Sequence, residues 1–390
     1  MNPALPLNLE MRKFVAPEFI FGLDARKLVL RYIKNLSLEK IFIASDKGIQ
    51  KAGWTDEILQ LLKDSGIQHE LFVDISPNPR DYEVMKGASF YKEKECDSVL
   101  AIGGGSVLDF AKGVGIVVSN GGNILDYEGI DKILYPMPPL ICIPTTGGTS
   151  ADVSQFAIIN DSNRKVKIAI ISKSVVPDVS LIDPLVLTSM DSYLTACTGI
   201  DALVHSIEAY VSNASSAFTD LYALESIKII KACLIPCLHD LKNVDLRGKI
   251  MLASLYAGLA FSNASLGCVH SMAHSLGGYL DLPHGECNAL LLPFVSEFNY
   301  DYAASRYDDI AEIFDFSFRT FNASERKKQL TEILLNFRKS AGITSCLKEK
   351  GITQNDLSIL AEKALNDPCT ITNPRKPTLS DLKHIYLRSF

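Results

Sequence analysis

Short apolar runs alternate with helical patterns through the first half of the chain. The runs are rich in valine, isoleucine and leucine, and most of them end near Asp, Gly or Pro, which is typical of buried strands. We predict strands at residues 41–45, 69–73, 98–102, 140–143, 167–171 and 179–182. Apolar positions at helical spacing predict helices at residues 54–63 and 81–94. Strands that alternate with helices indicate a parallel sheet covered on both faces.

The pattern changes after Asp183 and Pro184, where helical spacing replaces the strand-like runs. We predict helices at residues 191–212, 217–240, 246–277, 304–314, 324–340 and 354–365. A chain of 390 residues is also long enough for two domains of about 100–200 residues each. The sequence therefore predicts an α/β domain over residues 1–187 and an all-helical domain over residues 188–390.

The third predicted strand runs directly into a glycine-rich turn. Gly103, Gly104, Gly105 and Ser106 are followed at once by a helical stretch that begins at Val107. Glycine lets the backbone approach a ligand closely, and a serine can cap a helix whose free N–H groups bind anions. The glycines alone are equally compatible with a plain strand-to-helix turn, because the usual Gly-x-Gly-x-x-Gly spacing is absent.

A second polar loop makes a dinucleotide site the better interpretation. Thr145, Thr146 and Thr149 follow the fourth predicted strand, and ligands of open α/β sheets bind beyond the carboxyl ends of the strands. Asp46 ends the first predicted strand, where an acid accepts hydrogen bonds from an adenosine ribose, although an Asp there is often only a helix cap. This acid would repel a 2′-phosphate. We therefore expect a Rossmann-like domain that binds NAD rather than NADP.

The helical half carries a carboxylate and several histidines at regular spacing. Asp201 and His205 are four residues apart, and His270 and His274 repeat that spacing, so each pair shares one face of a helix. His284 follows shortly afterwards. One carboxylate with several imidazoles suits a divalent transition metal such as Fe(II) or Zn(II).

Two alternatives remain open at this point. A straight helix would hold His270 and His284 roughly 21 Å apart, so the metal site requires that Gly277-Gly278 and Pro283 break the helix between them. Each histidine taken alone is better explained as a hydrogen-bonded core residue. Burying Asp201 without a partner would be costly, however, which favours the metal. The spacing does not say which histidines are the ligands.

These segments together resemble the iron-containing alcohol dehydrogenase family, which is related to glycerol dehydrogenase. Residues 103–112, which include Asp109, are similar to the cofactor signature of that family. Residues 198–209 and 267–289 are similar to its two metal motifs, and residues 373–375 to a further marker. The loop at residues 145–152 departs from the usual Thr-Thr-Ala-Gly-Thr-Gly-Ser-Glu.

The resemblance implies a dinucleotide domain, a helical domain of the dehydroquinate synthase-like architecture, and a cleft between them. It implies that the metal, usually ferrous iron, is bound by Asp201, His205, His270 and His284. It places His274 beside the nicotinamide and the substrate, with a role in proton relay. It assigns to the cofactor Asp46, Asn78, Gly103, Gly104, Gly105, Ser106, Asp109, Thr145, Thr146, Thr149 and Lys167.

The expected activity is hydride transfer between NAD(H) and a small alcohol or aldehyde whose oxygen the metal polarises. A dehydroquinate synthase-like or glycerol dehydrogenase-like enzyme is an alternative on the same architecture. The former needs several cationic groups for a phosphorylated substrate, which we do not find near the metal motifs. A non-catalytic nucleotide- or metal-binding module is the third possibility, and the presence of His274 beside the ligand residues argues against it.

Composition bears on partners and compartment. Lys and Arg number 39 against 45 Asp and Glu, a net charge of −6 that argues against nucleic acid as a partner. No stretch approaches the roughly 18–20 apolar residues of a membrane span, and Met1–Pro3 do not begin a signal peptide. Nine cysteines without a Cys-x-x-Cys pair indicate reduced thiols of a cytoplasmic protein. Residues 14–21 offer an edge strand for pairing in a homo-oligomer.

Overall fold

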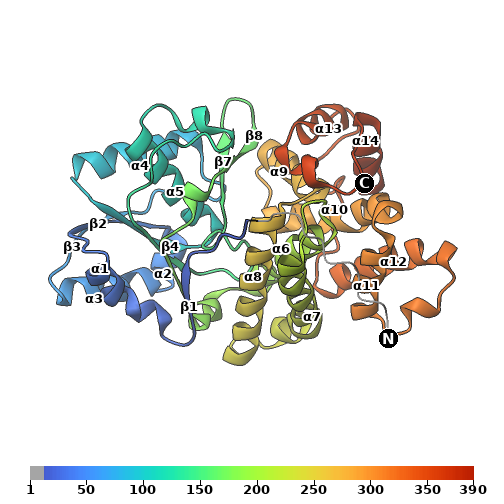
Figure 1. Ribbon diagram of the computed structural model, residues 1–390, viewed down its shortest axis with the longest axis horizontal. Helices are drawn as coiled ribbons and strands as arrows, with labels where there is room; N and C mark the ends of the chain where they lie inside the picture. The colour runs from blue at the N-terminus through green and yellow to red at the C-terminus, as the bar shows by residue number, and fades with distance from the viewer. Residues whose placement is uncertain (1–12) are drawn as a thin grey trace.

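The computed structural model describes residues 13–390, and the prediction for Met1–Pro3 lies outside that range. An α/β part, blue to green in Figure 1, lies beside a helical part, yellow to red. All strands of the described chain precede residue 183, and the first long helix of the second part begins at Ser192. The predicted fold class is confirmed, whereas the division at residue 187 stays a prediction.

The main sheet has six strands, all parallel, in the order β1-β9-β6-β4-β2-β3. Their bounds, in that order, are Glu18–Phe21, Val179–Ile182, Leu140–Pro144, Ser98–Gly103, Lys40–Ser45 and Gln68–Phe72. Every residue of β4 is buried, as expected for a strand covered on both faces. The predicted strand within residues 14–21 is β1, and it lies at an edge of the sheet.

Helices cover both faces because successive side chains of each strand point in opposite directions. Ile41 and Ile43 of β2 pack with Ile58 of α3 on one face, whereas Phe42 packs with Phe110 of α5 on the other. The helices of this part are α1 (Val29–Asn35), α2 (Lys47–Lys51), α3 (Trp54–Asp64), α4 (Asp81–Glu93) and α5 (Gly105–Asn120). The glycine-rich turn therefore leads from the centre of the sheet directly into a helix.

The strand predicted at residues 167–171 lies outside the main sheet. It is β8 (Val166–Ile171), which pairs antiparallel with β7 (Phe156–Asp161) and parallel with the short β5 (Gly129–Ile130). A tight turn joins β7 to β8, and β7 was not predicted. This small sheet carries Lys167 toward the helical part, where β8 packs against α9 (Cys268–Leu280).

The helical part differs from its prediction at two breaks and in two helices, at residues 284–299 and 379–388, that were not predicted. Its helices are α6 (Ser192–Val211), α7 (Ala217–His239), α8 (Val244–Ala264), α9 (Cys268–Leu280), α10 (His284–Asn299), α11 (Ala304–Phe314), α12 (Ala323–Ser340), α13 (Leu357–Leu365) and α14 (Leu379–Arg388). The single helix predicted at residues 246–277 is two helices, α8 and α9, which meet at 103°. Ser265, with φ 61°, ends α8 in the left-handed region that stops a helix.

The predicted break at Gly277-Gly278 was wrong, because α9 continues through both glycines to Leu280. A Cβ on Gly278 would lie 2.6 Å from the Cα of Val166, so this glycine lets the helix lie directly on β8. The chain turns instead at residues 281–283, where Asp281 has φ 56° and Pro283 precedes α10.

Two further features concern the surroundings of the protein. Among residues 13–390, no single helix is long and apolar enough to span a bilayer, although the bent pair of α8 and α9 passes that test when taken together. The nine cysteines are all free thiols, and eight of them are buried.

We expect Gly278→Ala to lower the free energy of unfolding by about 1–3 kcal/mol, because the added methyl group would overlap the backbone of β8. Gly248→Ala in α8 is the matched control, because a Cβ there would make only ordinary contacts with Pro184 at 3.8 Å. This control should be neutral or more stable by about 0.5–1 kcal/mol. Urea unfolding followed by circular dichroism measures both, and equal midpoints for the two variants would contradict the close packing.

Candidate active site

Three helices bring the predicted metal ligands together. Asp201 and His205 lie on α6, His270 and His274 on α9, and His284 begins α10. The Nε2 atoms of His270 and His284 each lie 3.8 Å from Oδ1 of Asp201. One ligand atom from each of these three residues lies within 4.8 Å of the others. The turn at residues 281–283 achieves this by returning the chain toward α9.

The amide of Asn288 shows that these ligand atoms face a common point. Its Nδ2 lies 2.6 Å from Oδ1 of Asp201, 3.2 Å from Nε2 of His270 and 3.3 Å from Nε2 of His284. Lone pairs from three helices thus converge on one positively polarised group. In addition, the Nδ1 of His284 and the Oδ1 of Asn288 are buried and have no hydrogen-bond partner among residues 13–390. A set of one carboxylate and imidazoles with this geometry fits a divalent cation.

His205 lies beside this set rather than within it. Its ring is stacked between those of Phe261 and His270, with centroid distances of 4.2 Å and 4.5 Å. Its Nδ1 donates to the carbonyl oxygen of Gly148 at 3.2 Å, which leaves the lone pair on Nε2. The structure therefore gathers three of the four predicted ligands within mutual reach and stacks the fourth against one of them.

Electrostatics leave the carboxylate charged and two of the imidazoles neutral. Burial by itself would raise the pKa of Asp201, but the hydrogen bond with His270 and the positive charge of its imidazole oppose burial, and that pKa is lowered. Burial lowers the pKa of His205 to about 3 and that of His284 well below its usual range. Neutral imidazoles have the free lone pair that metal ligation requires.

His270 differs in its protonation. Burial favours its neutral form, but hydrogen bonds with Asp201 and Glu208 raise its pKa to about 9. Ligation would require the neutral form of His270, with its proton on Nδ1 and a free lone pair on Nε2.

His274 faces the same cavity but has a different partner. Its Nδ1 donates to Oδ2 of Asp367 at 2.8 Å, and both side chains are buried. Its ring stacks on that of His284 with the centroids 5.3 Å apart. This histidine is therefore held beside the cluster through one nitrogen, with the other nitrogen left for a substrate or cofactor atom.

Two neighbouring cavities contain most of the remaining predicted residues. A groove of about 810 Å³ is lined by Asp46, Gly104, Ser106, Thr145 and Thr146, among others. A cavity of about 100 Å³ is lined by residues that include Asn78, Gly105, Ser106, Asp109, Thr149, Lys167, Asp201, His205, His270, His274 and His284. Ser106 lines both, so the start of α5 lies where the groove meets the histidine cluster. Gly103 is not among the residues that line either one.

The glycine-rich turn and the threonine loop pack against each other. Gly103 pairs with Pro144 across β4 and β6, so both loops begin at the same edge of the sheet. A Cβ on Gly104 would lie 2.9 Å from Cγ2 of Thr146, and only glycine permits this approach. The hydroxyls of Thr145 and Thr146 are buried, and no residue of the described chain forms a hydrogen bond with them. Buried hydroxyls of this kind normally have a partner, so their place on the groove fits a polar ligand such as a dinucleotide.

Asp46 and Asn78 are held by defined contacts. Oδ1 of Asp46 accepts from the N–H groups of Gly48 and Ile49. Asp46 therefore caps α2, which is the alternative that the sequence left open. Both bonds use one oxygen, which leaves Oδ2 for a ligand. Asn78 accepts from Nζ of Lys167 at 2.6 Å and donates to Asp281 at 2.9 Å, and it thereby connects the α/β part to the helical part.

Comparison with known proteins agrees with this geometry. The family model described as iron-containing alcohol dehydrogenase matches residues 16–184, and the model of the C-terminal part of the same family matches residues 195–390. The chain belongs to the iron-containing alcohol dehydrogenase family. It is accordingly an oxidoreductase that acts on alcohols.

Individual relatives cover almost the whole chain. Alcohol dehydrogenase 4 of Schizosaccharomyces pombe is 38% identical over 99% of this chain and 90% of its own length. The NAD-dependent methanol dehydrogenase of Bacillus methanolicus is 34% identical over 95% of this chain and 98% of its own length. A crystal structure of a 1,3-propanediol oxidoreductase, 34% identical, superposes with a TM-score of 0.93 over 98% of this chain and 100% of that one.

Three polar residues of the dehydrogenase site were given no role from the sequence, although two of them lie within the metal motifs at residues 198–209 and 267–289. They are Glu208, which contacts His270, Asp367, which contacts His274, and Asn288 at the centre of the ligand set. Glu208 had a signal, because it lies seven residues after Asp201 and therefore on the same face of α6. Asp367 precedes a short 3₁₀ helix at Pro368–Thr372, and nothing in its local sequence connects it with α9.

We expect His270→Ala to lose its metal and its turnover, because the change removes one predicted ligand. The variant should still bind NAD, because other residues line the groove. Metal content by elemental analysis after dialysis and NAD binding by calorimetry measure the two separately. The exposed His239→Ala is the control and should retain both. Full metal content and full turnover in His270→Ala would refute the assignment.

Proposed function

We propose that the protein transfers hydride between NAD(H) and a small alcohol or aldehyde at an iron site formed by Asp201, His205, His270 and His284. One observation carries this proposal: the groove that contains the glycine and threonine loops meets the cavity of the histidine cluster at Ser106. A dinucleotide lying along the groove would therefore present one end to the cluster. Relatives are named as NAD-dependent methanol dehydrogenase, 1,3-propanediol dehydrogenase and lactaldehyde reductase, which supports a small substrate.

The roles of the residues follow from their places. When bound, the metal polarises the substrate oxygen as a Lewis acid, and NAD accepts or returns the hydride. His274 holds or passes a proton at Nε2, while Asp367 fixes its other nitrogen. Phe156 and Phe261, whose rings lie 5.7 Å apart, form an aromatic wall of the cavity and exclude water from it.

The cofactor residues divide into two groups. Thr145 and Thr146 would bind polar groups of the dinucleotide through their free hydroxyls, and Asp46 would accept from the adenosine ribose through Oδ2. Asn78, Asp109, Thr149 and Lys167 line the inner cavity and would lie near the nicotinamide end. Fe(II) is the metal that the family implies, and Zn(II) is compatible with the same oxygen and nitrogen ligands.

Other activities have less support. A dehydroquinate synthase-like elimination would need several cationic groups around the substrate. Among residues 13–390, Lys167 is the one Lys or Arg that lines the cavity of the histidine cluster. A non-catalytic binding module would not require a histidine such as His274, held by a buried carboxylate beside the ligand cluster.

We expect purified protein loaded with Fe(II) to form NADH from a short primary alcohol, with NAD preferred over NADP. Absorbance at the NADH band measures this across short alcohols, diols and the corresponding aldehydes. Zn(II) loading in parallel distinguishes the two metals. Binding of NAD without turnover on any of these substrates would contradict the proposal.

A substitution at Asp46 tests the preference for NAD over NADP. Asp46→Ser retains a helix cap but removes the negative charge, so the ratio of kcat/KM for NADP to that for NAD should rise about tenfold or more, as expected from the loss of charge repulsion against a 2′-phosphate. Asp64→Ser, at the end of α3, is the control and should leave the ratio unchanged.

A homo-oligomer in the cytoplasm is part of the proposal. The strand β1 pairs with β9 on one side, and Phe19 and Phe21 of this edge strand are exposed. A second copy would cover this edge, since unpaired strand edges with apolar side chains favour association. The free cysteines support a reducing compartment. Light scattering of the purified chain should give the mass of a dimer or larger assembly, and a monomer at micromolar concentration would exclude the oligomer.

A further inference from the structure

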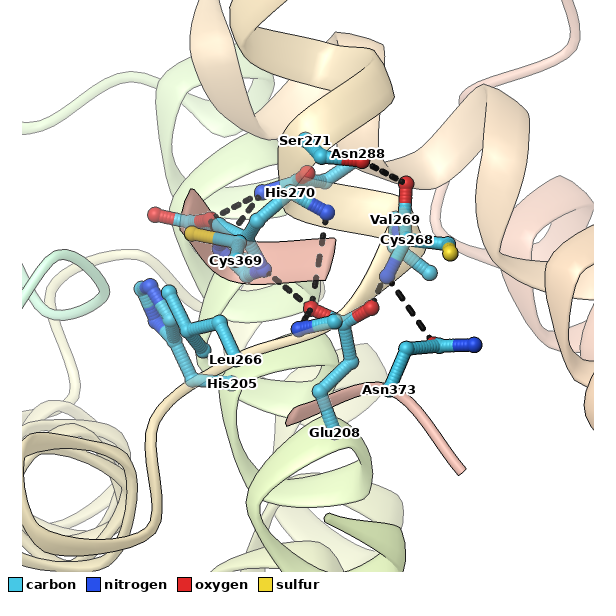
Figure 2. Close-up of polar contacts among 12 residues, drawn as sticks. His205, Glu208, Leu266, Cys268, Val269, His270, Ser271, Asn288, Cys369 and Asn373 are labelled. Atoms are coloured by element: carbon cyan, nitrogen blue, oxygen red, sulfur yellow. Dashed lines mark hydrogen bonds and ion pairs between the residues drawn. The ribbon is translucent and has the colours of Figure 1, made fainter. Parts of the chain in front are cut away.

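Glu208 is a buried carboxylate. No Lys or Arg of residues 13–390 forms an ion pair with it. It lies on α6 and points at the beginning of α9, as Figure 2 shows. Its side chain is 4% exposed. Taking a carboxylate out of water is costly unless hydrogen bonds replace the lost solvation, so its contacts explain why it can be there.

All four contacts of Glu208 are with N–H groups of α9 and its N-cap. Oε1 accepts from the backbone N–H of Val269 at 2.6 Å. Oε2 accepts from the backbone N–H groups of Gly267 and His270 at 3.0 Å and 3.4 Å, and from Nδ1 of His270 at 2.6 Å. The first N–H groups of a helix have no partner within the helix, and its positive end stabilises an anion. Glu208 therefore acts as an acceptor through both oxygens.

We propose that Glu208 is a positioning residue of the metal site, a role that rests on the proposed ligand function of His270. By accepting from Nδ1, Glu208 keeps the proton of the neutral ring on that nitrogen and leaves the lone pair on Nε2. The Nε2 atom faces Asp201 and Asn288, where the other ligand atoms converge. Because Glu208 also holds the backbone of His270, it fixes both the tautomer and the direction of the ring.

A helix cap alone is the competing explanation, and the chain offers a residue that separates the two. Oδ1 of Asn373 accepts from the backbone N–H of Cys268 at 3.0 Å, so Asn373 caps the same turn of α9 (Figure 2). Asn373 makes no hydrogen bond with the ring of His270. Capping is thus shared by Glu208 and Asn373, whereas contact with the imidazole belongs to Glu208.

Glu208→Gln tests the proposal in the full-length protein. A glutamine has one acceptor oxygen where the carboxylate has two. An amide NH₂ that faces Nδ1 of His270 would favour the proton on Nε2 and block ligation. We expect the dissociation constant for Zn(II), measured by competition with a chromophoric chelator, to rise about 10–100-fold. NAD binding should stay within about twofold, since the groove is lined by other residues.

Asn373→Ala is the matched control. It should lower the unfolding temperature of the metal-free protein, as Glu208→Gln also should, but leave the Zn(II) dissociation constant within about twofold. Equal losses of Zn(II) affinity in both variants would show that capping is the whole effect and would overturn the proposal. A Glu208→Gln variant with native affinity would overturn it as well.

A measurement on the native protein tests the proposal without requiring that Glu208→Gln and Asn373→Ala fold. With ¹⁵N-histidine labelling of the Zn(II)-loaded protein, His270 should show a hydrogen-bonded proton on Nδ1 and a metal shift on Nε2. Loss of the signals in His270→Asn identifies them among the seven histidines. Zn(II) on Nδ1 would overturn the positioning role. If the native protein binds no divalent metal, the proposed function itself fails, and this outcome differs from native affinity in Glu208→Gln.

Discussion

The burial of Asp201 is the constraint on which the architecture of the site depends. A carboxylate that is 1% exposed in a helical core must be balanced by nearby donors or positive charge. Its neighbours are imidazoles and one amide, contributed by α9 and α10, which are distant in sequence from the α6 of Asp201. None of these neighbours carries a permanent charge. A divalent cation is the group that would balance the carboxylate and use the imidazole lone pairs together.

Helix α9 connects this charge balance to the rest of the molecule. Its first turn is held by Glu208 and Asn373, which come from separate segments of the chain. Its middle carries His270 and His274, and its last turns lie on β8, where Gly278 allows close contact. Because both ends of the helix are fixed, the two histidines have little freedom to move apart. The same helix thus couples the cluster to the small sheet that carries Lys167.

The two histidines of α9 are held in the same way but face different neighbours. Each donates through Nδ1 to a buried carboxylate, Glu208 for His270 and Asp367 for His274. Each therefore keeps Nε2 free, one toward the ligand set and the other toward the cavity. A spacing of four residues places the rings on one face of the helix, and the carboxylates that orient them come from opposite directions in the sequence.

The sequence alone determined most of the elements and the chemical character of the site. Buried β-rich runs predicted the parallel strands, and i, i+4 spacing placed Asp201 with His205 and His270 with His274, because both depend on local periodicity. The break in residues 246–277, the passage of α9 through Gly277-Gly278, and the partners Glu208, Asp367 and Asn288 were decided by tertiary structure. These depend on which backbone lies against which helix. Such contacts join residues far apart in the chain, and no local pattern records them.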